Sequence, residues 1–253
     1  MRELNKMTTN KTITGAEAVI MALVENGVEV IFGYPGGAVL PLYDAIFDNK
    51  KIKHILVRHE QAAVHAAEGY ARSTGKVGCV LVTSGPGATN AITGLTDALM
   101  DSIPVICLSG QVPTHLIGTD AFQEADTTGI SRPCTKHNYL VKNADTLCGI
   151  IHESFEIAST GRPGPVLIDL PKDIQLTKVK YYKKINKFKN KSINNSPKID
   201  IKIITKVAEL LINAEKPIIY AGGGVINAGP KASTLLTELV ELLDSPVTLT
   251  LMG

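Results

Sequence analysis

The chain of 253 residues has 44% hydrophobic content and a formal net charge of +2. That length can bury the core of one large domain or one and a half, and the near-neutral charge argues against a nucleic-acid-binding protein. No stretch reaches the roughly 18 consecutive apolar residues of a membrane span, and the polar residues 1–11 carry neither a secretory-signal nor a transit-peptide pattern. We therefore expect a protein without a membrane partner that works in the compartment where it is made.

The cysteines indicate a reducing compartment. The four cysteines are Cys79, Cys107, Cys134 and Cys148. None has C-x-x-C spacing, and three of them lie in or beside apolar runs. Such cysteines are typical of buried thiols and not of a structural disulfide.

Helical and strand-like patterns alternate along the first 175 residues. A capping-box pattern at Thr14 and Glu17 predicts the start of a helix that ends at Gly27. Strands are predicted at residues 28–32, 54–58, 77–83, 104–109 and 165–170, with helices at 38–47, 61–74, 86–100 and 144–160 between them. This alternation favours an α/β domain with a doubly wound parallel sheet.

Glu60 lies at a strand-to-helix junction, which in open parallel sheets is where ligands bind. Small residues surround it (Ala62, Ala63, Ala66 and Ala67), and in the sequence only Arg58 is near enough to pair with it. Two interpretations stay open from these residues alone. Glu60 is a first-turn acid favoured by the helix dipole, or it is a buried group that handles a proton.

Two further loops follow predicted strands. Residues 84–90, Ser-Gly-Pro-Gly-Ala-Thr-Asn, lead directly into a helix, as in loops that hold an anion on backbone N–H groups, but they lack the G-x-G-x-x-G order. A ligand-binding loop and a tight turn are both consistent with this pattern. Residues 110–135 form a long connection, and its interspersed apolar residues (Leu116, Ile117, Phe122 and Ile130) indicate an ordered loop over the sheet edge.

The composition changes after the first domain. Eight of the 26 basic residues fall between Lys178 and Lys198, where there is no Asp or Glu, which favours a linker or a solvated surface strap over a nucleic-acid patch. A second βα pattern follows: helix 200–213, strand 217–221, Gly222–Gly224, helix 231–243 and strand 246–251. Because two strands make almost no sheet, we expect the N-terminal portion of a longer protein.

Seven short blocks carry a family resemblance: 33–37, 59–61, 68–72, 83–90, 118–124, 135–138 and 161–165. With them, residues 12–253 resemble the catalytic large subunits of the acetolactate synthase (acetohydroxyacid synthase) family. The blocks His59-Glu60-Gln61 and Ser84-Gly-Pro-Gly87 are shared with other thiamine-diphosphate enzymes, whereas Gly118–Gln123 and Thr135–Asn138 point to this family.

The resemblance implies a domain organisation and a set of site residues. Residues 12–175 would be a thiamine-diphosphate pyrimidine-binding domain, 176–198 a linker, and 199–253 the truncated start of a central FAD-binding α/β domain. Glu60 would be catalytic and hydrogen-bond N1′ of the aminopyrimidine. The other residues implied to bind cofactors are Tyr34, Pro35, Gly36, Pro86 and Asn90 for thiamine diphosphate, and Arg162, Gly222, Gly223, Thr250, Leu251 and Met252 for FAD. Those implied to border the substrate and inhibitor channel are Ala38, Pro113, Ala121, Phe122, Gln123 and Lys172. From the residues alone, Arg162 is equally a surface Arg before a strand.

The resemblance also implies an activity. It is the condensation of two pyruvates, or of pyruvate and 2-oxobutyrate, with loss of CO2 in branched-chain amino-acid biosynthesis. A homodimer with a small regulatory subunit would use thiamine diphosphate, FAD and Mg²⁺. The chain lacks the Gly-Asp-Gly…Asn motif that holds Mg²⁺ and the diphosphate. We therefore expect the metal ligands in a missing C-terminal domain and none in this chain.

Three alternatives remain: an inactive N-terminal fragment of that enzyme, a pyruvate oxidase, or a glyoxylate carboligase. The Lys/Asn/Ile-rich tract between Lys178 and Lys198 suggests an AT-rich genome. We therefore expect a plastid stroma if the gene is plastid-encoded and otherwise a bacterial cytoplasm.

Overall fold

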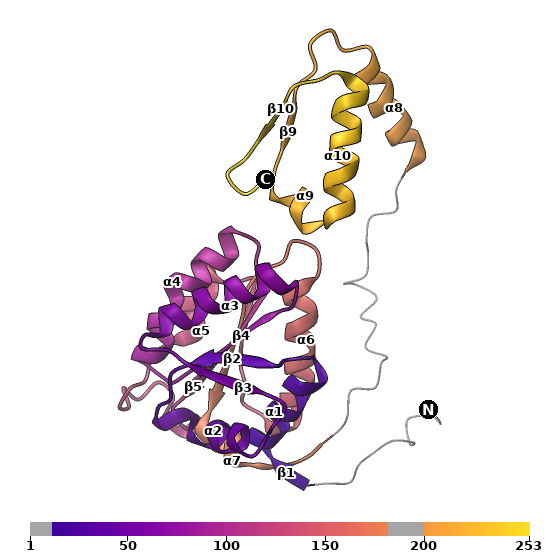
Figure 1. Ribbon diagram of the computed structural model, residues 1–253. Coiled ribbons are helices and arrows are strands. Elements are labelled where there is room, and N and C mark those ends of the chain that lie inside the picture. Colours follow the sequence, from indigo (N-terminus) through magenta and orange to yellow (C-terminus); the bar gives the residue numbers. More distant parts are fainter. Residues whose placement is uncertain (1–11, 182–199) are drawn as a thin grey trace. The chain divides into compact units, whose positions relative to one another are not determined.

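The computed structural model describes residues 12–181 and 200–253, in two compact units divided near residue 194. The first unit contains a six-stranded, wholly parallel sheet in the order β3-β2-β4-β5-β7-β6 (Figure 1). Its strands are β2 (Val30–Gly33), β3 (Lys53–Leu56), β4 (Gly78–Val82), β5 (Val105–Gln111), β6 (His137–Leu140) and β7 (Val166–Pro171). The expected parallel α/β fold is confirmed.

Helices cover both faces of this sheet. They are α1 (Gly15–Glu25), α2 (Leu40–Phe47), α3 (Glu60–Thr74), α4 (Pro86–Met100), α5 (Thr127–Ser131), α6 (Leu147–Ser159) and α7 (Lys172–Leu176). Short 3-10 turns stand at Gly37–Val39, Thr114–Leu116, Arg132–Cys134 and Ala144–Thr146. The capping box at Thr14 and Glu17 forms as expected, with Glu17 N donating to Thr14 Oγ1 and Thr14 N to Glu17 Oε2.

The central strands divide the core into two layers. Successive side chains of β4 point to opposite faces, so Cys79 and Leu81 pack with α1 and α6, whereas Val80 and Val82 pack with α3 and α4. Strands that are buried on both faces must be apolar throughout, which is why β4 and β5 were recognisable in the sequence. All four cysteines are free, and Cys79 and Cys107 are fully buried.

The structure corrects several sequence-based boundaries. The edge strand β6 was not predicted, and the expected loop 110–135 begins inside β5 and contains α5. Two short strands, β1 (Thr12–Thr14) and β8 (Lys178–Lys180), pair antiparallel, and Val179 and Tyr181 are buried in the first unit. Residues 178–181 of the expected linker therefore pack with the first unit, while residues 182–198 lie outside the described residues.

The second unit has little core of its own. It consists of α8 (Ile201–Ile212), β9 (Ile219–Ala221), α9 (Gly223–Asn227), α10 (Pro230–Leu243) and β10 (Val247–Leu249), with β9 and β10 parallel. The short helix α9 begins within the glycine turn, at Gly223, and was not predicted. Neither α8 nor α10 contains a buried residue, and apolar side chains such as Leu210 and Leu242 are exposed. None of the described helices combines the length and the apolar character that crossing a membrane requires.

Candidate cofactor site

Glu60 is the first residue of α3 and lies at the carboxyl end of the sheet. The preceding His59 caps the helix, with Gln61 N donating to His59 Nδ1 at 3.2 Å. The Glu60 side chain is nearly buried, and Asn90 Nδ2 donates to its Oε2 at 3.0 Å. No ion pair in the described residues involves Glu60, so Arg58 is not its partner. The carboxylate is therefore held by a neutral amide and not neutralised by a cation.

Three loops come together beside Glu60. A Cβ placed on Gly36 would stand 2.5 Å from Thr83 Cβ, and one on Gly87 would stand 2.7 Å from Thr83 Cγ2 and 3.5 Å from Glu60 Oε1. Gly85 has a φ of 56°, and a Cβ there would meet the backbone oxygen of Gln123 at 2.5 Å. Any side chain at these positions would separate the loops, which explains the glycines of the Ser-Gly-Pro-Gly block.

Thr83 was not predicted as a site residue, although it lies between these loops. It is 8% exposed, and its hydroxyl oxygen has no hydrogen-bond partner in the described part of the chain. A buried hydroxyl without a partner is costly and marks a place where a polar ligand group can bind. The signal available in the sequence was its position as the last residue before the glycine loop.

The expected lining residues divide into two groups. Glu60, Gly36 and Asn90 come together with Thr83 and Gly87 as described above. Tyr34 and Pro35 lie on the loop after β2, Pro86 is the first residue of α4, and all three are exposed. The backbone N–H of Tyr34 donates to Leu81 O at 3.2 Å. Because the side chains of these three residues do not pack in the core, they are available to contact a ligand.

Of the expected channel residues, Ala38 follows β2, Lys172 follows β7, and the other four follow β5 (Pro113, Ala121, Phe122 and Gln123). Ala38 Cβ lies 2.9 Å from the position that a Cβ would take on Gly110. Gln123 adopts a φ of 58° beside Gly85, and Phe122 is 88% exposed. Ala121 N donates to the Glu124 carboxylate at 3.0 Å, as Gly118 N also does, so the loop closes on itself.

Pro113 and Lys172 are connected through their neighbours. Thr114 N, one residue after Pro113, donates to Asp173 Oδ1 at 3.0 Å, and the Thr114 hydroxyl donates to the other oxygen. These two bonds hold the start of the loop against α7, whose first residue is Lys172.

A buried polar network that the sequence did not reveal anchors the same loop. Asp169 on β7 accepts hydrogen bonds from Ser109 Oγ at 2.7 Å and from Gln111 Nε2 at 2.9 Å. Gln111 Nε2 also donates to Ala125 O at 2.9 Å. Burial raises the pKa of Asp169 to about 7, because the two hydrogen bonds only partly offset the desolvation of its charge.

Arg162 lies away from this cluster. Its guanidinium donates to Met100 O at 2.9 Å, to Leu99 O at 3.2 Å and to Ser102 Oγ at 2.7 Å. These carbonyls are at the C-terminus of α4, whereas Gly87 and Asn90 are in its first turns. A cation at a helix C-terminus is a favourable structural arrangement, so the first unit gives Arg162 a role before any ligand is considered.

The five expected FAD residues of the second unit lie together. Thr250 N donates to Ala221 O at 2.9 Å, which ties the ends of β9 and β10. A Cβ on Gly222 would stand 3.6 Å from the Thr250 side chain, and one on Gly223 would stand 3.0 Å from Met252 O. Leu251, between them, is 99% exposed. The loops that follow β9 and β10 thus meet at the carboxyl ends of these two parallel strands, the expected position for a ligand.

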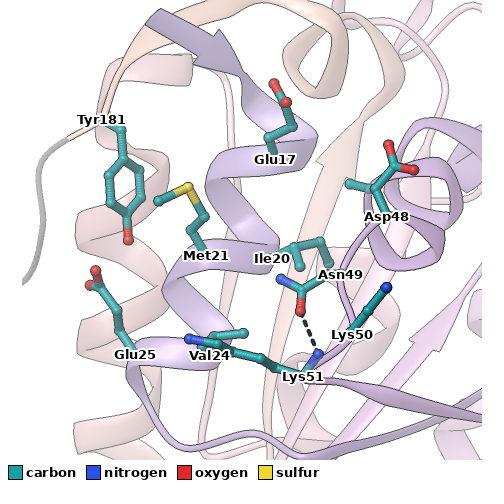
Figure 2. A pocket seen from close by; sticks show the side chains of 11 residues that line it. Glu17, Ile20, Met21, Val24, Glu25, Asp48, Asn49, Lys50, Lys51 and Tyr181 are labelled. Carbon is teal, nitrogen blue, oxygen red and sulfur yellow. Dashed lines mark hydrogen bonds between the residues drawn. The ribbon is translucent and has the colours of Figure 1, made fainter. Parts of the chain in front are cut away.

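A pocket of about 730 Å³ lies elsewhere, between α1 and the residues that follow α2 (Figure 2). In this view the Tyr181 phenol points toward the Glu25 carboxylate; burial, and then Glu25, raise the pKa of that phenol. None of the residues that line this pocket is one of the expected site residues. The pocket is therefore separate from the Glu60 site.

Two family models match this chain. The family model described as thiamine pyrophosphate enzyme, N-terminal TPP binding domain, matches residues 13–130, and the model for the central domain of these enzymes matches residues 204–253. The chain belongs to the thiamine pyrophosphate enzymes. Glu60, Thr83 and Gly87 all lie within the segment that matches the cofactor-binding model.

Three relatives of this thiamine pyrophosphate enzyme indicate its subfamily. The acetolactate synthase large subunit of Haemophilus influenzae is 53% identical over 244 residues, which are 96% of this chain and 42% of that protein. The acetolactate synthase isozyme 3 large subunit of Escherichia coli is 52% identical over 242 residues, 95% of this chain and 42% of that protein. The probable acetolactate synthase large subunit of Methanocaldococcus jannaschii is 50% identical over 246 residues, 94% of this chain and 40% of that protein. The chain spans about two fifths of the length of these relatives.

Proposed function

We propose that this chain is the N-terminal portion of the catalytic large subunit of an acetolactate synthase. The enzyme would condense two pyruvates, or pyruvate and 2-oxobutyrate, with loss of CO2. The identity of 50 to 53% to three large subunits supports this proposal. The single structural observation that carries it is the Glu60 carboxylate, held by Asn90 at the meeting point of three glycine-containing loops.

The residues around Glu60 fit the aminopyrimidine of thiamine diphosphate. Glu60 Oε2 is occupied by the Asn90 amide, which leaves Oε1, next to Gly87, to share a proton with a ring nitrogen. The Thr83 hydroxyl, which lacks a partner among the described residues, adds a second polar group at the same place. Thiamine diphosphate, when bound, supplies the carbon nucleophile that breaks and forms bonds next to a 2-oxo acid carbonyl.

In this proposal the residues of the chain bind and orient the cofactor and move one proton. Glu60 holds the proton at a pyrimidine nitrogen, and Asn90 fixes the direction of its carboxylate. Gly36 and Gly87 let their backbones pack closely on Thr83 beside the ring, while Tyr34, Pro35 and Pro86 would contact the ring. The loop with Pro113, Ala121, Phe122 and Gln123, together with Ala38 and Lys172, borders the substrate path.

The remaining cofactors and partners are also proposals. FAD would contact Arg162 and the loops with Gly222, Gly223, Thr250, Leu251 and Met252. The ligands for Mg²⁺ would come from a C-terminal domain of the complete enzyme. The relatives' designation as large subunits supports a small-subunit partner, and we propose a homodimer of large subunits. For location we propose a bacterial cytoplasm, or a plastid stroma if the gene is plastid-encoded.

Product analysis tests the proposal. The complete enzyme, of which this chain would be a portion, is supplied with pyruvate, thiamine diphosphate, Mg²⁺ and FAD, and acetolactate is measured colorimetrically. We expect acetolactate that depends on added thiamine diphosphate. Oxidation of pyruvate without acetolactate would instead indicate a pyruvate oxidase, and condensation of glyoxylate alone would indicate a glyoxylate carboligase.

A further inference from the structure

Three potential metal ligands meet on α3 and α4, outside the cluster around Glu60. His65 and Glu68 are three residues apart on α3 and therefore lie on the same face of that helix. Asp97 comes from α4. His65 Nδ1 is 3.5 Å from Glu68 Oε1 and 3.5 Å from Asp97 Oδ2, and the three donor atoms all lie within 4.8 Å of one another.

One carboxylate oxygen of the buried member of this group lacks a hydrogen-bond partner among the described residues. Glu68 is only 5% exposed, and in the described part of the chain its Oε1 accepts no hydrogen bond. The nearby Arg72 is bound to Asp101 instead. A buried carboxylate oxygen in this state carries a desolvation cost that a bound cation removes. This orphaned oxygen, together with the mixed donor set, distinguishes the group from an ordinary surface patch of acids.

The imidazole has a neighbour that can set its tautomer. The Gln61 side chain, one helical turn before His65, places its amide nitrogen Nε2 3.3 Å from His65 Nε2. Rotation of this amide group by 180° would place its oxygen there instead, where it accepts the Nε2–H, so that Nδ1 keeps its lone pair for a metal. Metal-bound histidines commonly donate their second N–H to such a partner.

We propose that His65, Glu68 and Asp97 form a binding site for a divalent transition-metal ion, of which Zn²⁺ fits the donors best. Around a tetrahedral ion with bonds of about 2.1 Å, neighbouring donor atoms stand about 3.4 Å apart. The two 3.5 Å separations from His65 Nδ1 match this spacing. The side chains of His65 and Asp97 are 40% and 50% exposed, which leaves water access to a fourth position.

The donor types separate this site from the cofactor's Mg²⁺. Imidazole nitrogen suits Zn²⁺, Co²⁺ and similar ions, whereas Mg²⁺ takes oxygen ligands and keeps several waters. The inference does not rest on the proposed enzymatic reaction, because neither the cofactor nor the substrate takes part in it.

Cobalt binding tests the site directly. The tag-free first unit, residues 12–181, has a six-stranded sheet and two core layers of its own; it is stripped with a chelator and titrated with Co²⁺, while visible absorption reports the coordination geometry. We expect saturation at one Co²⁺ per chain with the intense bands of a tetrahedral complex, bleaching by Zn²⁺ and no displacement by millimolar Mg²⁺. His65→Ala and Asp97→Asn should each abolish the bands, because each removes one of three ligands.

Two control variants and one fold measurement complete the test. His115→Ala and Asp145→Asn remove an exposed imidazole and an exposed carboxylate elsewhere in the first unit and should leave the bands intact. Far-ultraviolet circular dichroism should be the same for all variants, since the four substituted side chains are partly or largely exposed. Unsaturable binding, or bands that survive both His65→Ala and Asp97→Asn, would overturn the proposal and leave the three groups as a hydrated ion-pair cluster.

Discussion

Asn90 Nδ2 on α4 donates a hydrogen bond to Glu60 Oε2 on α3 across 3.0 Å. The two residues are thirty positions apart in the sequence and come together because α3 and α4 pack side by side on one face of the sheet. The bond fixes the direction of the carboxylate without neutralising it. Asn90 is therefore a positioning residue for Glu60 in the proposed reaction.

Removal of the Asn90 amide should slow the proposed reaction. A hydrogen bond to a charged group contributes about 1.5 to 3 kcal/mol, so Asn90→Ala should lower kcat by roughly 10- to 100-fold. The same bond contributes to the free energy of unfolding, so Asn90→Ala should also lower the midpoint of thermal unfolding. Steady-state kinetics of the complete enzyme check the prediction, and an unchanged kcat would show that Glu60 is oriented by other groups.

The buried Asp169 should make stability depend on pH. Burial raises its pKa from 3.8 to about 7, so the folded chain binds more protons than the unfolded chain between these values. The contribution of Asp169 to the unfolding free energy therefore falls as pH rises through this window, by up to about 4 kcal/mol in total.

Asp169→Asn provides the matching measurement, since asparagine is similar in shape and uncharged at every pH. The stability of the variant relative to the wild type should increase from pH 5 to pH 8 in denaturant titrations. Parallel stability curves for the two proteins would contradict the assignment of the raised pKa to Asp169.

Pro113 should influence inhibitors that enter the proposed channel. Pro113→Ser removes a loop-surface contact but opens no core, because Pro113 is not buried. We expect weaker inhibition by sulfonylurea- and imidazolinone-type herbicides, with fold and most activity retained. Dose–response curves of the complete enzyme measure the effect, and unchanged sensitivity would place this loop away from the channel.

The 253-residue chain alone should fold in part but produce no acetolactate. The first unit has a six-stranded sheet with two core layers, whereas the second exposes the apolar residues of α8 and α10. We expect cooperative unfolding of the first unit and aggregation through the second. Appreciable acetolactate from the purified chain with all cofactors, free of complete enzyme, would show that the metal-binding portion is not needed.

The sequence predicted the features that local chemistry determines. The capping box at Thr14, the fully buried strands β4 and β5 and the junction at Glu60 follow from short patterns that tertiary contacts do not override. The edge strand β6 was missed because His137 and Asn138 are polar and the strand is covered incompletely. The five-residue helices α5 and α9 are too short to show a periodicity of 3.6 residues.

Contacts between distant residues account for the parts of the site that were missed. Asp169 is bound by Ser109 and Gln111, which are 60 and 58 positions away in the sequence. No local sequence pattern indicates such a network. Thr83 stood within a recognised block, but its importance depends on Gly36 and Gly87 approaching it from two sides. The sequence alone allows two interpretations of Arg162, and the structure adds the carbonyls of α4 as its partners.

The turnover of Glu60→Gln in the complete enzyme tests the central claim most directly. The substitution keeps the shape of the side chain but removes its proton-accepting carboxylate. Acetolactate formation should fall by roughly 10²- to 10⁴-fold with unchanged FAD content. Glu29→Gln, which alters a surface glutamate paired with Lys76, should retain the wild-type rate. Near-normal turnover of Glu60→Gln would contradict the assignment of Glu60 as the group that holds the cofactor's proton.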